Sequence, residues 1–418
     1  ALLIRDETSR EQFEDILSYV RDWGEPGFIW ASSRDHCFNP CSEINMQPIA
    51  PDGQTGMQFC NLCEINGLQC TNKEQLFCAA RAAAILGTLQ AGYTNFKYLT
   101  DATRQITERE ALIGVGITGW MNNPDVLFDE DNMKEAARIV KETNAEVAAL
   151  LGINPAARTT CVKPSGNAST LLGCASGIHG EHAKTYIRNI QLNENDEVLK
   201  VFERTNPHLV EKSMWSTYGT DKMVSIPVVV PGESHKYKHE LTGVKQLEYV
   251  KKAQQCWVEE GTNVHLCTDP TLRNNVSNTI DVDDWEQVGR YIYDNRQWFA
   301  GISLMSGFGD RAFVQSPFQE VKSAETIFDE WGEASMFASG LIVDGIAAFG
   351  DLWAGCTALL FGDNSIDSES HESLLKRDWI RRANKFAYNY FNNDVDSMTV
   401  CLKDCFLLHK WRDLERKI

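Results

Sequence analysis

The chain has 418 residues, 43% of them hydrophobic and 23% charged, which is typical of a globular protein with a large buried core. Its formal charge of −18 argues against a general nucleic-acid surface, which needs a basic face. Its 13 cysteines show no spacing typical of a secreted disulfide framework and no signal peptide is recognisable, so we expect a cytoplasmic protein. Charged residues and glycines interrupt the most apolar stretch, 336–360, which predicts a buried core element rather than a membrane span.

Predicted helices alternate with short strands along most of the chain. An amphipathic helix with apolar residues from Phe13 to Val20 precedes the breaker Gly24–Gly27, and a buried strand at 28–31 then leads into a loop around Cys41. The glycine-spaced run Gly114–Gly119 allows close backbone packing. This alternation is typical of an α/β fold built on parallel strands. Further helices are predicted at 72–91, 131–151, 247–257 and 285–298, and further strands at 159–162, 224–230 and 301–305.

The loop around Cys41 carries the most reactive combination of side chains. Asn39, Cys41 and Glu43 are each two residues apart, and in an extended loop such residues point the same way, toward one polar substrate. Pro40 stiffens the backbone between them, and Cys60 supplies a second thiol nearby. The set fits a cysteine that performs radical or redox chemistry, and the alternative is a buried structural cysteine beside a surface glutamate.

The same cysteines allow a different interpretation. Cys37, Cys41, Cys60 and Cys63 have spacings within the range of structural zinc sites, so a zinc-stabilised binding protein is an alternative. Against it, Cys63 continues into an alternating apolar frame and not into a glycine-rich knuckle turn. His179 and His182 match no metalloprotease spacing, and hydrogen-bonded loop histidines are the simpler explanation.

A small polar segment, Lys163–Ser169, connects a predicted strand to a helix start. Exposed amides and the helix dipole at such a turn are typical of a phosphate-binding site. The lysine precedes the glycine, so the segment is not a Walker loop, and a plain strand-to-helix connection explains it equally well.

Several motifs, in order along most of the chain, resemble those of ribonucleotide reductase large (catalytic) subunits. The resemblance is closest to the monomeric, adenosylcobalamin-dependent (class II) ribonucleoside-triphosphate reductases. The matching stretches are NPCSEI at 39–44, FCNLCEIN at 59–66, REALIGVGITGW at 109–120, TTCVKPSGNASTLLGCASGIHGEHAKTYIRNI at 159–190, RNNVSNTI at 273–280 and GISLM with QSPFQE within 301–320.

The resemblance implies the C-terminal portion of a ten-stranded α/β barrel, with a central finger loop that carries the radical cysteine. Cys41 would become a thiyl radical and take the 3′ hydrogen of the ribose, and Glu43 would act as general base at the 3′ hydroxyl. Asn39 would hold the sugar, and Cys60 would be one of two thiols that reduce the 2′ position and end as a disulfide.

The resemblance also implies partners and a cofactor. Adenosylcobalamin would supply the radical, and an external dithiol such as thioredoxin would restore the active-site thiols. The substrate phosphates would be bound by the small polar turn, namely Ser165, Gly166, Asn167, Ala168 and Ser169.

This chain departs from the family pattern at both ends. The disulfide partner of Cys60 and the effector region are expected upstream, and a tail with paired cysteines is expected beyond the barrel, later than Cys401 and Cys405. We therefore expect residues 1–418 to form one catalytic barrel domain that is incomplete at both ends and needs another chain.

Two alternatives within this resemblance stay open. In one, the radical comes from a separate ferritin-like subunit, although that route uses adjacent tyrosines and the nearest approach here is Tyr388-Asn389-Tyr390. In the other, the chain is an inactive half that pairs with a second chain to complete the barrel.

Overall fold

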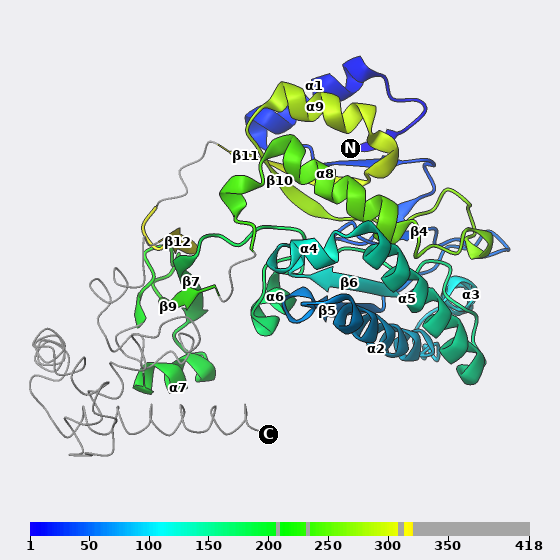
Figure 1. Ribbon diagram of the computed structural model, residues 1–418, viewed down its shortest axis with the longest axis horizontal. Helices are drawn as coiled ribbons and strands as arrows, with labels where there is room; N and C mark the ends of the chain where they lie inside the picture. Colours follow the sequence, from blue (N-terminus) through cyan, green and yellow to red (C-terminus); the bar gives the residue numbers. More distant parts are fainter. Residues whose placement is uncertain (206–209, 231–234, 308–312, 321–418) are drawn as a thin grey trace, which may run out of the picture. The chain divides into compact units, whose positions relative to one another are not determined.

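The structure is a computed structural model that describes residues 1–205, 210–230, 235–307 and 313–320 (Figure 1). The chain forms two compact units, the first of residues 1–181 and 234–309 and the second of residues 182–233 and 310–418. The predictions for residues 336–360, for Tyr388 and Tyr390, and for Cys401 and Cys405 lie outside the described residues. One catalytic barrel domain over residues 1–418 therefore stays a prediction.

The first unit is built on strands that are mostly parallel. Strands β1 (Leu2–Ile4) and β2 (Phe28–Ala31) are parallel to each other, as are β10 (Asn278–Val282) and β11 (Gly301–Ser306), and β11 runs antiparallel to β2. Strand β5 (Leu62–Asn66) pairs in parallel with β6 (Gly114–Thr118).

The segment 159–162 connects these two groups of strands. Parallel bridges join Val115 to Thr160 and Val162 to Val276, just before β10. The strands thus follow one another in the order β1, β2, β11, β10, segment 159–162, β6 and β5. The predicted strands at 28–31 and 301–305 are confirmed, and 159–162 takes a strand position through bridges rather than a full ladder.

Helices follow the strands as the alternating pattern predicts. Helix α2 packs against α5, β5 and β6, whereas α8 and α9 pack against each other and α8 also contacts β10 (Figure 1). The predicted helix at 247–257 is in fact α8 followed by a π-helical turn, Gln254–Val258. The helices of this unit are α1 (Arg10–Trp23), α2 (Lys73–Ala91), α3 (Asp101–Glu110), α4 (Pro124–Leu127), α5 (Glu130–Leu151), α6 (Gly166–Leu172), α8 (Gly243–Ala253) and α9 (Trp285–Asp294).

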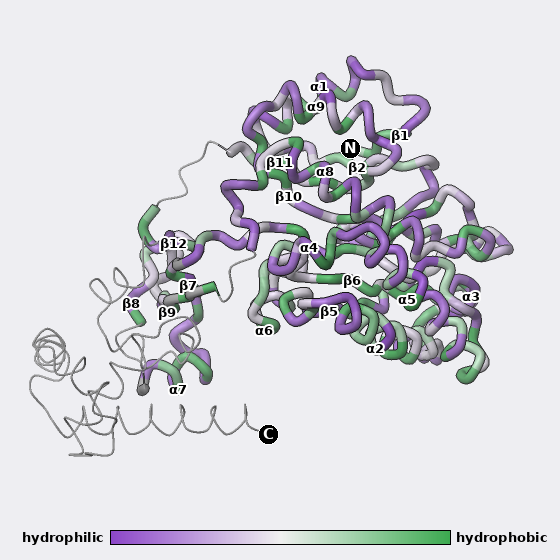
Figure 2. The backbone as a smooth tube through the Cα atoms, in the orientation of Figure 1, coloured by the Kyte–Doolittle hydropathy of each residue, from purple (hydrophilic) through white to green (hydrophobic). Residues whose placement is uncertain are grey.

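Local sequence explains the helix ends and the close packing of the strands. The side chain of Asn72 accepts a hydrogen bond from the Gln75 amide at 3.0 Å, which caps α2 as predicted. Strand β6 is buried along its whole length and alternates between near-neutral and hydrophobic residues (Figure 2). A Cβ atom on Gly114 would lie 2.6 Å from Leu62 Cδ2, so β6 needs glycine there to approach β5.

The second unit contains an antiparallel sheet in the order β12, β7, β9, β8, with helix α7 (Glu197–Thr205). Its strands are β7 (Thr185–Asn193), β8 (Val210–Lys212), β9 (Asp221–Val229) and β12 (Phe318–Glu320). The predicted strand at 224–230 exists, but the prediction that it belongs with the parallel strands was wrong, because both its neighbours are antiparallel. Within the described residues, no helix has the length and apolar character to cross a membrane.

Candidate active site

The finger loop, residues 37–46, is a short hairpin that presents Cys41 at its turn. Strand β3 (Cys37–Phe38) pairs antiparallel with β4 (Asn45–Met46). The Asn39 side-chain oxygen accepts a hydrogen bond from the Ile44 amide at 3.0 Å, and the Asn39 carbonyl accepts one from Ser42 at 2.8 Å.

The turn has a backbone conformation that the sequence did not predict. Ser42 has φ of 62°, so the loop is not extended as expected, and the side chains flanking Ser42 do not share a direction through strand alternation. As a result, Cys41 is exposed whereas Glu43 is completely buried.

Asn275, just before β10, holds the finger loop from the neighbouring strands. Its backbone amide donates to the Glu43 carbonyl at 2.8 Å, and its side-chain amide donates to the carbonyls of Ser42 and Gly301, each at 3.0 Å. A Cβ on Gly301 would lie 2.5 Å from the Ser42 Cβ, so the loop rests directly on the backbone of β11. These contacts fix the backbone on both sides of Ser42.

A buried ion pair supports the other side of the finger loop. Arg158 donates to the Asn45 carbonyl at 2.9 Å and pairs with Glu110 at 3.1 Å, and both of these charged side chains are fully buried. Burial alone would raise the pKa of Glu110, but the Arg158 charge and hydrogen bonds from Arg158, Thr268 and Gln58 lower it to about 2. Glu110 is therefore held as a carboxylate.

Lys163 connects the thiol and the carboxylate of the finger loop. Its Nζ lies 3.3 Å from Glu43 Oε1 and 3.5 Å from Cys41 Sγ. Burial alone would lower the pKa of Lys163, but the Glu43 charge and the hydrogen bonds outweigh it, so the pKa is raised. The other oxygen of Glu43, Oε2, is buried and has no hydrogen-bond partner.

Cys60 completes the group of predicted residues. Burial, followed by the charge of Glu43, raises the pKa of the Cys60 thiol, and the neighbouring Asn39 amide and Lys163 charge oppose the rise. Cys63 points elsewhere, since its sulfur accepts a hydrogen bond from Gln90 Nε2 at 3.3 Å. The structure therefore brings Asn39, Cys41, Glu43 and Cys60 close together, and their roles in an active site stay a prediction.

The metal alternatives find no support in this geometry. Among the residues that the structure describes, no group of three or more His, Cys, Asp or Glu side chains is arranged to hold a metal ion. His179 is hydrogen-bonded on both ring nitrogens, to the Ser176 carbonyl at 2.8 Å and to the Thr279 amide at 3.3 Å.

The small polar turn begins α6, as the sequence predicts. Ser165 precedes the helix with φ of 51°, and the amides of the first helical turn have no carbonyl partner within the helix. Gly166 and Asn167 are exposed, whereas Ser169 is buried and its hydroxyl donates to the Gly166 carbonyl at 3.1 Å. The Ser169 hydroxyl is therefore engaged within the turn, whereas the backbone at the exposed Gly166 and Asn167 is accessible.

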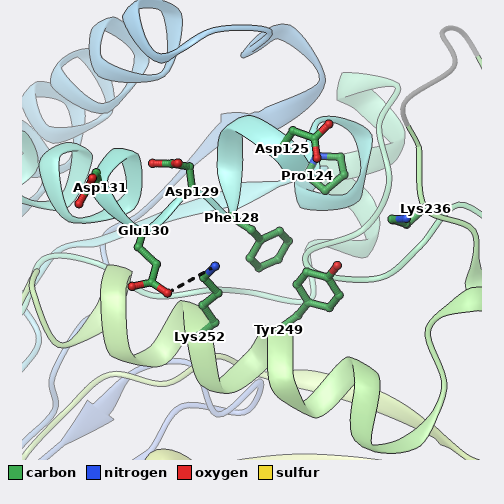
Figure 3. Close-up of a pocket in the computed structure, with 9 residues that line it drawn as sticks. All are labelled: Pro124, Asp125, Phe128, Asp129, Glu130, Asp131, Lys236, Tyr249 and Lys252. Atoms are coloured by element: carbon green, nitrogen blue, oxygen red, sulfur yellow. Dashed lines mark ion pairs between the residues drawn. The ribbon is translucent and has the colours of Figure 1, made fainter.

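A separate groove of about 550 Å³ lies between α4, the start of α5 and α8 (Figure 3). Lys252 and Glu130 form an ion pair of 3.6 Å across it. Its lining includes none of the predicted site residues and consists of Pro124, Asp125, Phe128, Asp129, Glu130, Asp131, Lys236, Tyr249 and Lys252.

Comparison with known proteins identifies relatives of this chain. A protein of Mycobacterium phage D29 that is assigned to the adenosylcobalamin-dependent ribonucleoside-triphosphate reductases is 24% identical over 337 residues, covering 71% of this chain and 45% of that protein. The adenosylcobalamin-dependent ribonucleoside-triphosphate reductase of Euglena gracilis is also 24% identical, covering 74% of this chain and 42% of its own length. A scan against models of known families finds no match.

The structural comparison concerns the fold. The crystal structure of a B12-dependent (class II) ribonucleotide reductase superposes with a TM-score of 0.62 at 18% identity, covering 84% of this chain and 50% of that one. The chain has the fold of class II ribonucleotide reductases. The predicted resemblance and the predicted α/β barrel class are thereby confirmed, and the chain spans about half the length of the relatives it matches.

Three functional candidates were not predicted from the sequence. From the sequence, Lys163 was assigned only to the phosphate-binding segment, and Asn275 was noted only within a matching motif. Glu64 was noted only as part of the alternating apolar segment after Cys63. Lys163 could have been found from the sequence, because it directly follows a buried strand segment. The contacts of Asn275 and Glu64 depend on strands that are distant in sequence.

Proposed function

We propose that this chain carries the active site of an adenosylcobalamin-dependent ribonucleotide reductase, which reduces ribonucleoside triphosphates to 2′-deoxyribonucleotides for DNA synthesis. The observation that supports it most directly is the convergence of Cys41, Glu43 and Lys163 within 3.5 Å contacts, with Asn39 and Cys60 beside them. The likeness to named reductases is consistent with this chemistry.

Each residue has a position that fits its proposed role. The exposed Cys41 thiol takes the 3′ hydrogen of the ribose, and the buried Glu43 takes the proton of the 3′ hydroxyl through its unpartnered Oε2. Asn39 holds the sugar, and Cys60 gives a hydrogen to the 2′ position as one of two reducing thiols. Burial keeps Cys60 as a thiol, since its pKa is raised.

The radical source is the proposed cofactor. When bound, adenosylcobalamin supplies an organic radical that can remove the hydrogen atom of a thiol. The residues fit such a group, because Cys41 is exposed at the turn of the loop while Glu43 beside it is shielded from water. Lys163 keeps the Cys41 thiol beside the Glu43 carboxylate.

The remaining assignments extend this proposal. The turn of Ser165, Gly166, Asn167, Ala168 and Ser169 binds the substrate phosphates through its backbone amides. Within the described residues, β1 and β5 each pair with a single neighbouring strand, so we place the other barrel strands, and the partner thiol of Cys60, outside the described residues, with a second chain as the proposed source. A thioredoxin-like dithiol restores the thiols, and ten free cysteines among the described residues are consistent with a reducing cytoplasm.

The test is reduction of CTP with adenosylcobalamin and a dithiol, by the chain alone and with any upstream-encoded fragment. Cys41→Ala and Glu43→Gln should abolish deoxycytidine triphosphate formation, whereas Cys78→Ala, which removes an exposed thiol on α2, should retain it. Full turnover by the Cys41 variant would refute the proposal. Activity only with the added fragment would support the assignment of the missing strands, and complete inactivity with no tritium exchange from the cofactor would favour an inactive half.

A further inference from the structure

Helix α2 is apolar on two opposite sides. Its buried side, which includes Leu76 and Ala80, packs on β5 and β6. Its other side is also apolar but exposed, and Ile85, Leu86 and Leu89 there are 36%, 58% and 51% exposed. The outer face of a surface helix normally carries polar side chains, so this second apolar face is typical of one that another helix covers.

The exposed side of α2 has the spacing of a helix–helix seam. Its apolar stripe consists of Cys78, Ala82, Ile85 and Leu89, at intervals of four, three and four residues. Each of them comes two residues after a buried position, about 200° around the helix, so the stripe faces away from β5 and β6.

The sizes of the side chains make this stripe complementary to itself. Cys78 and Ala82, toward the N-terminal end, are small, whereas Ile85 and Leu89 are large. If the stripe of a second copy lies antiparallel, small side chains face large ones, as close packing requires. A parallel arrangement would place large side chains against each other and leave a gap between the small ones.

Helix α5, which lies beside α2, shows the same self-complementarity in its charges (Figure 1). Every fourth position along its exposed side carries a charge, first two basic and then two acidic residues, namely Lys134, Arg138, Glu142 and Glu146. In antiparallel pairing with a second copy, basic residues face acidic ones along the whole row. In parallel pairing like charges would face each other.

The ion pairs that these residues make within one copy do not oppose such a contact. Lys134 and Arg138 each pair with a glutamate one turn away, and Glu146 lies 3.2 Å from Arg81 of α2. All of these side chains are exposed, and exposed ion pairs contribute little to stability. Charges of a second copy can therefore join or replace them.

One two-fold axis satisfies both helices. The apolar stripe is symmetric about the midpoint between residues 82 and 85, and the charged row is symmetric about residue 140. Thr88 and Asn144 lie at one level, because the Asn144 amide donates to the Thr88 hydroxyl at 2.8 Å, and Leu151 lies beside Gly92 further along both helices. Thr88 is about 7 Å past the first midpoint and Asn144 about 6 Å past the second, so the two midpoints share a level.

We propose that this chain forms an antiparallel two-fold dimer with a second copy of itself through the outer faces of α2 and α5. Such a contact uses the same patch on both copies and therefore closes at two. The face is about 30 Å long and two helices wide, so it buries roughly 600 Å² per copy and about 1,200 Å² in total. This area is at the lower end for stable interfaces, so we expect a Kd in the micromolar range. The inference does not depend on the proposed function.

Sedimentation velocity of the full chain between about 1 and 100 µM tests the dimer. Wild type should change from monomer to dimer over this range, and Leu89→Glu should weaken self-association at least about tenfold. Glu286→Lys reverses an exposed charge on α9 and is the matched control, so it should dimerise as wild type does. A wild-type chain that stays monomeric, or a dimer that persists in Leu89→Glu, would overturn the proposal.

A charge exchange on α5 tests the direction of pairing. The double variant Lys134→Glu, Arg138→Glu makes the row entirely acidic, and Glu142→Lys, Glu146→Lys makes it entirely basic. Each variant should be monomeric alone, and mixing the two should restore the dimer, which requires that both are folded. If each double variant dimerises alone as well as wild type does, the antiparallel charge pairing is wrong.

Alkylation of the exposed Cys78 thiol distinguishes a second copy from another occupant of the stripe. With iodoacetamide as the probe and mass spectrometry of peptides as the readout, Cys78 should react at least about threefold more slowly at 100 µM chain than at 1 µM. Cys37, an exposed thiol on the finger loop, should react equally at both concentrations. Protection of Cys78 that requires an upstream-encoded fragment and not a higher concentration would assign the stripe to that fragment and reject the dimer.

Discussion

Replacing Glu110 with glutamine leaves the Arg158 guanidinium buried beneath the finger loop without a counter-charge. Both side chains are fully buried, and Arg158 also holds the Asn45 carbonyl. Removing one partner of a buried ion pair typically costs about 3–5 kcal/mol, because the remaining charge is left uncompensated.

The pKa of Glu110 gives a second route to this magnitude. The value falls from 4.5 to about 2 in the folded chain. A difference of roughly 2.5 units corresponds to about 3 kcal/mol of stability near neutral pH. Because the folded pKa is lowered, this contribution is present above about pH 4.5 and is lost as the pH falls toward 2.

Denaturant unfolding at pH 7, followed by tryptophan fluorescence, measures the effect. We expect Glu110→Gln to lose about 3 kcal/mol, and the double variant Glu110→Leu, Arg158→Met to recover most of it because no charge stays buried. A loss below about 1 kcal/mol in the single variant would refute the assignment of a buried, ionised pair. Equal instability of the single and double variants would show that packing, and not charge, dominates.

Two further predictions follow from the same site. Asn275→Ala removes the side-chain hydrogen bonds to the Ser42 and Gly301 carbonyls, so it should lower the free energy of unfolding by about 2 kcal/mol and reduce turnover through misplacement of Cys41. The control Asn263→Ala loses a single hydrogen bond to Ala156, so it should lower the free energy of unfolding by about 1 kcal/mol and leave kcat unchanged. Folding raises the pKa of Glu64 from 4.5 to about 7, so the folded chain binds the proton more tightly than the unfolded chain. The contribution of this proton to the stability of the folded chain is lost as the pH rises through this range. Wild-type unfolding free energy should fall by about 2 kcal/mol from pH 5 to pH 8 relative to Glu64→Gln, and parallel pH profiles would contradict this.

Local patterns predicted most helices of the first unit and its strands β2 and β11, but missed most of its other strands. Asn72 as a helix cap and the apolar strand at 28–31 are features that neighbouring residues determine, and both are present. The strand at 224–230 was placed with the wrong partners, because alternation indicates a strand but does not identify the strand beside it.

The proximity of the candidate site residues could be predicted from the sequence, but their geometry could not. The family motifs pointed to Asn39, Cys41, Glu43 and Cys60, and the structure brings them together. The left-handed Ser42 was not predicted, since it depends on the Asn275 hydrogen bonds and on the missing side chain of Gly301. Lys163 and Glu64 likewise acquire their surroundings only when β5, β6 and segment 159–162 lie side by side.

The contacts that hold Ser42 also determine when the site comes into existence. Asn275 follows Ser42 by 233 residues in sequence, Gly301 lies 26 residues further on, and loop closures over such separations are slow steps in folding. Until β10 and β11 have folded, the Cys41 thiol has no defined position beside its base. Cys41 is thus held in its observed position only once β10 and β11 lie against the finger loop.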